Sequence, residues 1–144
     1  MRILKYLLVL LCLQISFSQS FASEKLQLQK VTDNVYAIVG ELGNRTPENL
    51  GNNATFGVVV TSEGVVVIDS GGTYKGAEEI HRLIKSITDV PISIVINTGG
   101  QDHRWLGNGY FKEQGAKLVA SKKAVEDQKA RTQYQFIMLG NFLG

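Results

Sequence analysis

Apolar and polar residues alternate or cluster in a way that predicts four β-strands in the first half of the chain. KLQLQKV (25–31) alternates, and VYAIVG (35–40) is rich in β-branched and aromatic residues after the turn TDN (32–34). FGVVV (56–60) and VVVID (65–69) flank TSEG (61–64), a spacing typical of a β-hairpin. The nearly continuous valine runs predict strands that are covered on both faces.

The pattern changes to a helical period after residue 73. An apolar stripe on a helix over 74–87 is predicted by Ala77, Ile80, Leu83, Ile84 and Ile87. We expect a buried strand over 92–96, a short helix over 110–114 and a short strand over 117–120. Ser121 is the expected N-cap of a polar helix that reaches about residue 135. The order is hairpins, then β-α-β-loop-β-α.

Residues 40–53, GELGNRTPENLGNN, have no apolar period and are rich in Gly and Asn. We interpret them as a mobile loop or hairpin. A connection of this length without its own helix or strand is a candidate for a functional role.

The first 22 residues have the features of a secretory signal peptide. Arg2 and Lys5 precede the apolar stretch 6–15, and Ser20-Phe21-Ala22 offers a small-x-small cleavage site before Ser23. The apolar stretch is short for a bilayer span, so a retained anchor helix is the weaker alternative. We therefore expect a signal peptide over 1–22, a mature domain over 23–144, and a periplasmic or secreted protein without membrane attachment after cleavage.

Loss of this segment changes the charge and the cysteine content. The full chain has 15 Lys and Arg against 13 Asp and Glu, and removal of Arg2 and Lys5 leaves 13 of each. A neutral domain gives no reason to expect a nucleic-acid or anionic-membrane partner. The single cysteine, Cys12, is also removed, which excludes a disulfide or a thiol nucleophile in the mature domain.

Asp69 is the first candidate for chemistry. It ends the strand VVVID, and the carboxyl ends of buried strands form the edge at which α/β proteins build their sites. The alternative is an Asp that caps the following turn or helix. SGGTYKG (70–76) has neither the dinucleotide nor the Walker spacing of glycines, which disfavours a nucleotide-binding domain.

Asp102 and His103 are the second candidate, on the predicted loop NTGGQDHRWLGN (97–108). Carboxylate and imidazole suit zinc, but a zinc site commonly needs three protein ligands, and an isolated Asp-His pair is more often a surface pair. The other aromatic and imidazole side chains have ordinary explanations. We interpret His81 as a helix-edge residue, Trp105 as a packing residue or pocket wall, and Tyr36 and Tyr110 as strand or core-edge aromatics.

Together these motifs resemble the metallo-β-lactamase superfamily. The resemblance runs over about 25–124, through VYAIVG, FGVVVTSEGVVVIDSGG, PISIVINT, the Asp-His loop, Gly107-Asn108 and GAKLVAS. It implies an α+β fold, namely the first half of an αββα sandwich. It also implies that Asp69 supports the metal loop and that Asp102 and His103 bind the second of two metals, zinc or another divalent ion, with Asp102 also orienting the attacking water.

The family pattern Thr-His-x-His-x-Asp-His is degenerate in this chain. Alignment from Asp102-His103 puts Thr98 and Gly100 at the two leading histidines, whereas alignment from the preceding strand puts Gly99 and Gln101 there. In both alignments the first-metal histidines are missing, so one ion, at the second-metal position, is expected. No histidine follows His103, and the chain stops within the apolar stretch FIMLGNFLG (136–144), so we expect the natural fold to continue past Gly144.

Two functions remain open. The first is an exported hydrolase in which a metal-activated water attacks an ester, thioester, lactam or similar bond of a small-molecule substrate. The second is a non-catalytic binding or scaffold protein that keeps the fold and has lost the metal cluster. In either case we expect the 144-residue chain alone to be inactive and to associate, with itself or with a missing C-terminal half, through an uncovered apolar sheet face.

Overall fold

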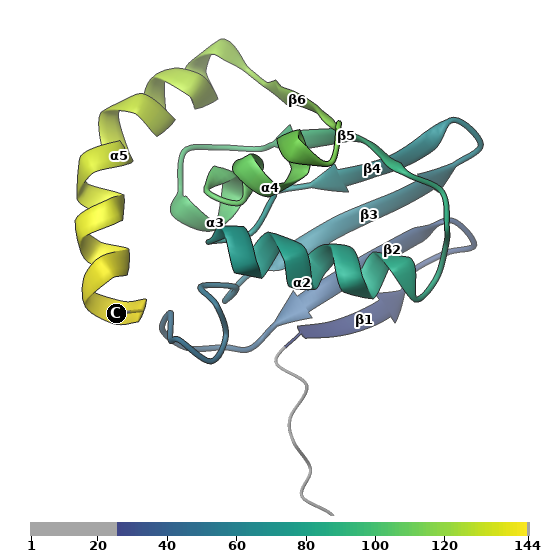
Figure 1. Cartoon of the computed structure of the whole chain (residues 1–144), viewed down its shortest axis with the longest axis horizontal. Helices are drawn as coiled ribbons and strands as arrows, with labels where there is room; N and C mark the ends of the chain where they lie inside the picture. Colours follow the sequence, from purple (N-terminus) through teal and green to yellow (C-terminus); the bar gives the residue numbers. More distant parts are fainter. Residues whose placement is uncertain (1–25, 144) are drawn as a thin grey trace, which may run out of the picture.

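The computed structural model describes residues 26–143, and the predicted signal peptide lies outside the described residues. The chain order of the elements matches the expected one, with one short helix, α3, added after β5 (Figure 1). The elements are β1 (Leu26–Lys30), β2 (Val35–Gly40), β3 (Thr55–Thr61), β4 (Gly64–Ile68), α2 (Tyr74–Lys85), β5 (Ile92–Asn97), α3 (Asp102–Trp105), α4 (Asn108–Glu113), β6 (Lys117–Ala120) and α5 (Lys122–Leu143).

A single six-stranded sheet has its strands in the order in which they occur along the chain. Strands β1 to β4 are antiparallel, which confirms the predicted hairpins. Strands β4, β5 and β6 are parallel, because α2 and then α3 and α4 return the chain to the same end of the sheet. The β3–β4 turn is tighter than expected, because Thr61 pairs with Gly64 and only Ser62 and Glu63 remain between the strands.

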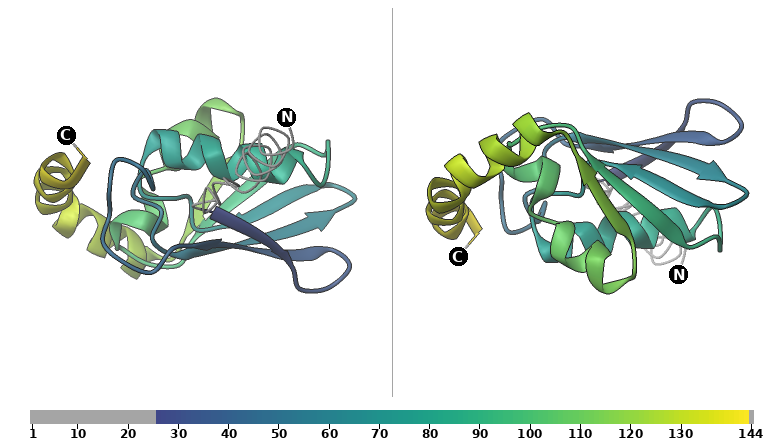
Figure 2. Two further views of the ribbon diagram at one scale, coloured as in Figure 1. Left: turned by 90° about the horizontal axis from the view of Figure 1, so that it is seen from below. Right: turned by 90° about the horizontal axis from the view of Figure 1, so that it is seen from above.

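The core lies between one face of the sheet and the helices α2 and α4, which Figure 2 shows on the same side. Phe56, Val67 and Val95 from the sheet and Ile80 from α2 are fully buried there. The Oγ1 atom of Thr73 caps α2 by accepting a hydrogen bond from the Gly76 amide at 2.9 Å. The apolar stripe of α2 therefore packs as its period predicts.

The opposite face of the sheet has no described helix or strand on it. Registered neighbours on this face include Val59 paired with Val66, and Ile68 paired with Ile96. All four are half-buried, whereas the core valines are fully buried. Within residues 26–143, helices cover one face of the sheet. The prediction of strands covered on both faces is therefore confirmed for that face alone.

Helix α5 is longer than expected and differs from the other helices in its packing. Its predicted N-cap is confirmed, because Ser121 Oγ accepts a hydrogen bond from the Ala124 amide at 3.1 Å. The helix continues to Leu143 and stands at the edge of the molecule, on the side of α3 (Figure 1). Its C-terminal part exposes Tyr134, Phe136 and Ile137. In residues 26–143, no helix combines the length and hydropathy needed to span a membrane.

Candidate functional site

The candidate residues meet at one edge of the sheet. Because β4 and β5 are parallel neighbours, their carboxyl ends lie side by side. Asp69 directly follows β4, and Asp102 and His103 begin the one-turn helix α3 after β5. The prediction of a loop at Asp102 and His103 was therefore wrong in detail. A helical turn forms there, with the Leu106 amide bonded to the Asp102 carbonyl at 3.0 Å.

Asp69 links the two segments that leave β4 and β5. Its carboxylate accepts a hydrogen bond from the Thr98 amide at 2.7 Å and bonds from the Thr98 hydroxyl at 2.8 and 3.0 Å. Arg104 Nη1 lies 3.8 Å from the same carboxylate. The backbone of Asp69 has φ of +65°, a left-handed conformation that Asp and Asn enter more readily than other non-glycine residues. These contacts tie the start of the 98–101 segment to β4.

The residues after Asp69 hold α3 through their backbone. The Ser70 amide donates to the Arg104 carbonyl at 3.2 Å, and the Gly71 amide donates to the His103 carbonyl at 3.0 Å. A Cβ atom on Gly107 would overlap the Ser70 carbonyl, so a glycine is needed for this close approach. The position of α3 is consequently set by main-chain contacts.

Asn108, the second residue of the Gly-Asn motif, pairs with Asn97 at the end of β5. Each side-chain amide donates to the other, at 3.0 and 2.7 Å, and Asn97 also donates to the Arg104 carbonyl at 2.6 Å. The pair closes the turn that contains α3. This gives the Gly107-Asn108 motif a structural explanation that does not depend on a metal.

Asp102 is the most strongly held charge in the site. It is 3% exposed, and the guanidinium of Arg45 binds both of its carboxylate oxygens, with Nη2 2.6 Å from Oδ1 and Nε against Oδ2. His103 Nδ1 lies 3.5 Å from Oδ1 of Asp102 and 3.4 Å from Arg45 Nη2. Burial of Asp102 favours its neutral form, but the hydrogen bonds from His103 and Arg45 and the charge of Arg45 outweigh this effect. The pKa of Asp102 therefore lies well below its ordinary value.

Helix α5 contacts the segment 98–101, to which the sequence resemblance assigned the two absent histidines. Gln128 Nε2 donates to the Gly99 carbonyl at 3.1 Å, and Gln135 Nε2 donates to the Gly100 carbonyl at 2.7 Å. Both glutamines are buried. Gln135 Oε1 also accepts a bond from the indole of Trp105 at 3.1 Å, so Trp105 is a packing residue between α3 and α5.

Thr98 and Gln101, the other two positions of this segment, also have partners. Thr98 binds Asp69 as described, and the Gln101 side chain accepts a hydrogen bond from Arg104 Nε at 2.9 Å. The backbone carbonyl of Gln101 accepts the Arg104 amide at 2.9 Å, which starts the turn of α3. All four positions thus contribute to the local structure.

The fit of this site to a metal can be judged from its ligands. Carboxylate and imidazole are suitable ligands for zinc, which usually takes three from the protein and keeps one position for water. Within residues 26–143, no group of three or more His, Cys, Asp or Glu side chains is placed to hold a metal. Asp102 and His103 are the two ligands present, and Arg45 contacts both. The described residues therefore do not fit a zinc ion by themselves.

Two contributors to the site were not identified from the sequence. Arg45 is 57 residues from Asp102 along the chain, and the loop that carries it has no period that indicates an inward side chain. In the segment 40–53, predicted as a mobile loop or hairpin, buried Asn49 and Asn52 form hydrogen bonds. Asn52 accepts the Gly72 amide at 3.0 Å and donates to the Gly76 carbonyl at 2.9 Å. In the sequence, the repeated Asn residues of the loop were the feature that could have indicated these hydrogen bonds.

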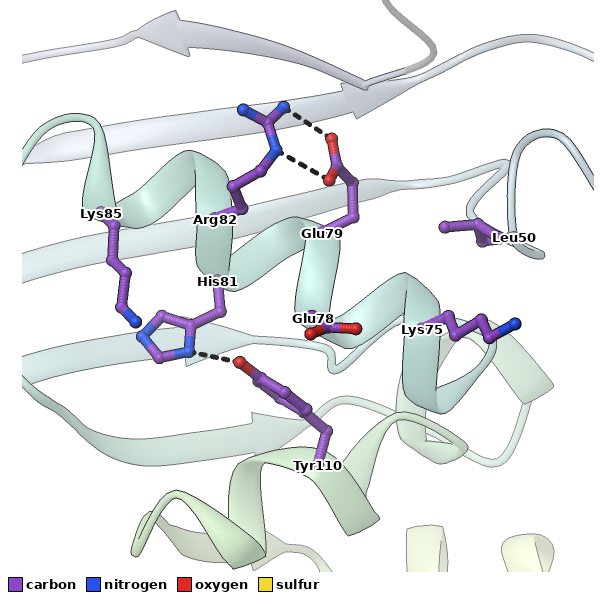
Figure 3. Close-up of a pocket in the computed structure, with 8 residues that line it drawn as sticks. All are labelled: Leu50, Lys75, Glu78, Glu79, His81, Arg82, Lys85 and Tyr110. Carbon is purple, nitrogen blue, oxygen red and sulfur yellow. Dashed lines mark hydrogen bonds and ion pairs between the residues drawn. The ribbon is translucent and has the colours of Figure 1, made fainter.

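A separate cavity of about 460 Å³ lies over the outer side of α2, away from these residues (Figure 3). His81 and Tyr110 line it, with His81 Nδ1 2.9 Å from the Tyr110 hydroxyl. Arg82 in this cavity is paired with Glu79. The contact confirms the interpretation of His81 as a helix-edge residue and places Tyr110 at the edge of the core.

Comparison with solved structures identifies the fold. A metallo-beta-lactamase from Pontibacter korlensis is similar to this chain with a TM-score of 0.55 and 23% sequence identity, over 67% of this chain and 44% of that chain. The chain thus spans less than half the length of this neighbour. No protein-family model matches the chain. The six-stranded sheet with its helices has the metallo-β-lactamase-like fold that the sequence motifs predicted.

Proposed function

We propose that this chain is part of an exported hydrolase of the metallo-β-lactamase fold. The observation that carries the proposal is the meeting of Asp69, Thr98, Asp102 and His103 at the carboxyl ends of β4 and β5. Residues far apart in the sequence converge in such folds because parallel strands end at one edge, where catalytic residues gather. In this proposal Asp69 supports the loop, and Asp102 and His103 act in the site.

A divalent ion bound at such a site lowers the pKa of a bound water and supplies hydroxide near neutral pH. The two ligands among the described residues do not hold such an ion alone. The proposal therefore requires further ligands from outside residues 26–143, and it assigns Asp102 and His103 as two members of that set. The substrate class is a small molecule with an ester, thioester or lactam bond. The name of the structural neighbour favours a lactam as the first compound to assay.

Zinc titration by calorimetry of the full-length product, which would carry the further ligands that the proposal requires, tests it directly. The Asp102→Ala, His103→Ala double variant is the control. We expect zinc binding to the unaltered protein that the double variant lacks, and hydrolysis of one of the three bond types when zinc is present. Equal zinc binding by both proteins would exclude Asp102 and His103 as ligands.

A metal-free binding or scaffold protein is the second candidate function. It is favoured by the ion pair of Arg45 with Asp102, since both carboxylate oxygens are already engaged by a cation. This candidate predicts that the mature protein purifies without metal and that His103→Ala leaves its ligand binding unchanged. Loss of a hydrolytic activity in the His103→Ala variant would eliminate it.

A further inference from the structure

We propose that Arg45 is a built-in counter-cation of the site and that its ion pair with Asp102 latches the loop 40–53 over Asp102 and His103. The guanidinium binds the carboxylate through two nitrogens, on both oxygens. This is the planar, two-pronged geometry that gives Arg–carboxylate pairs their strength and direction. The pair joins a loop before β3 to a helix after β5.

The energetic contribution of the Arg45–Asp102 ion pair depends on how far it is buried. The Asp102 side chain is 4% exposed and that of Arg45 is 22% exposed, so water screens the pair weakly. A buried carboxylate without a partner is strongly destabilising, whereas an exposed pair contributes little. Asp102 consequently needs a cation beside it in the folded protein, and Arg45 supplies that charge.

Hydrogen bonds from Asn49 hold the backbone on both sides of Arg45. Asn49 Oδ1 accepts the Thr46 amide at 2.9 Å, and Asn49 Nδ2 donates to the Asn44 carbonyl at 2.9 Å. These bonds flank Arg45 on both sides of the chain. Farther along, the Leu50 carbonyl accepts the Thr73 hydroxyl at 2.7 Å, which fixes the second half of the loop to the start of α2. The first half of the loop, which carries Arg45, contacts α3 through the guanidinium of Arg45.

A metal bound to Asp102 would need at least one of the same two oxygens. A guanidinium on both of them and a metal ion on either are alternatives, because cations in contact with one carboxylate repel each other at short range. Access to Asp102 therefore requires Arg45 to withdraw and the first half of the loop to move. This consequence for metal rests on the proposed function, whereas the latch itself does not.

Hydrogen–deuterium exchange of the metal-free protein tests the latch. We expect amides in 40–46 to exchange about tenfold to a hundredfold faster in Arg45→Met, a ratio that corresponds to the loss of hydrogen bonds to a charged group. Arg45→Lys should give an intermediate rate, because an ammonium lacks the two-pronged geometry. Arg82→Met, which removes a cation from the outer side of α2, is the matched control and should leave the loop unchanged.

A second variant separates the latch from general stability. Arg45→Met leaves Asp102 buried without its partner and should lower the melting temperature. Arg45→Met with Asp102→Asn removes that charge as well, so the melting temperature should recover while exchange in 40–46 stays fast. Exchange in 40–46 that is as slow in both variants as in the unaltered protein would overturn the proposal.

Zinc titration of the full-length product and of its Arg45→Met variant distinguishes this inference from the proposed function. Binding at least tenfold tighter in Arg45→Met than in the unaltered protein would support competition between Arg45 and a metal. Equal zinc affinity in the two proteins would overturn that competition. Fast loop exchange in Arg45→Met with no zinc binding in any variant would support the latch and refute the metal-dependent proposed function.

Discussion

The side chain of Asp69 stabilises this edge of the sheet through several hydrogen bonds. Its carboxylate receives the amide and the hydroxyl of Thr98, and its backbone has φ of +65°. The residue at this position must therefore accept two donors and also tolerate a left-handed conformation. Asparagine satisfies the second requirement and part of the first, because it lacks the charge and one of the acceptor oxygens.

Replacement of Asp69 separates these two requirements. We expect Asp69→Ala to lower the free energy of unfolding by about 1.5 to 3 kcal/mol, the range for hydrogen bonds to a charged group. Asp69→Asn should lose roughly half as much, because it can still accept the Thr98 amide. Urea denaturation of the three proteins measures both values. Equal losses in the two variants would show that the conformation of Asp69 has no part in its role.

His81 gives a pH dependence of stability. Burial, and then the charge of Lys85 on the same helix, lower the pKa of His81 below its ordinary value of 6.5. The unfolded chain then binds the proton more tightly than the folded one, so stability is fully present above about pH 6.5 and is lost as the pH falls toward the lower folded pKa. His81→Gln should reduce the loss of stability between pH 7 and 5, as measured by urea midpoints. Identical pH profiles for the two proteins would contradict this assignment.

At the scale of elements, the packing of α5 gives Gly99 and Gly100 a structural role. Gln128 and Gln135 reach the carbonyls of Gly99 and Gly100. A Cβ atom on Gly100 would overlap the Asp127 carboxyl group and lie 2.8 Å from the Asp127 Cβ, so α5 would have to shift. On Gly99 the nearest atom would be Arg104 Cδ at 3.2 Å, which belongs to a flexible side chain. The close packing of α5 depends on Gly100.

The two adjacent glycines therefore provide a matched pair of variants. We expect Gly100→Ala to lower the free energy of unfolding by about 1 to 3 kcal/mol, the usual effect of overpacking. Gly99→Ala should change it by less than about 0.5 kcal/mol. Trp105 fluorescence during urea denaturation reports on the contact, since its indole binds Gln135. Similar losses in both variants would mean that α5 does not pack on Gly100 in solution.

The sequence predicted the elements well and the site only in part, for a physical reason. Strands such as 35–40 and helix 74–85 carry their own periodic pattern, so their type follows from local residues. The contacts of Arg45 and Gln135 join residues 57 and 35 positions apart and depend on how the elements pack. The motif indicated Asp69 and Asp102, and the structure brings both to the same edge of the sheet, after β4 and β5. The motif contains no residue that corresponds to Arg45, the cation beside Asp102.

At the scale of the whole molecule, the sheet covers its core on one side only within residues 26–143. The opposite face carries half-buried Val59, Val66, Ile68, Ile94 and Ile96. A domain is normally stable as two or more packed layers, and an apolar face without a second layer tends to associate. Self-association, or association with a further half of the fold, therefore stays a prediction. This face is the surface through which we expect it to occur.

A lysine on the uncovered face tests this expectation. We expect the product of residues 23–144 to form dimers or larger species at micromolar concentration and to bind a hydrophobic dye, because the half-buried valines and isoleucines gain from leaving water. Val66→Lys in the central strand β4 should reduce both signals, since a charge in such an interface is costly to desolvate. Thr61→Lys, at the exposed end of β3, is the control for added charge. Sedimentation velocity measures the species present. A monomeric, dye-free, cooperatively folding product would mean that the face is stable in water without a partner.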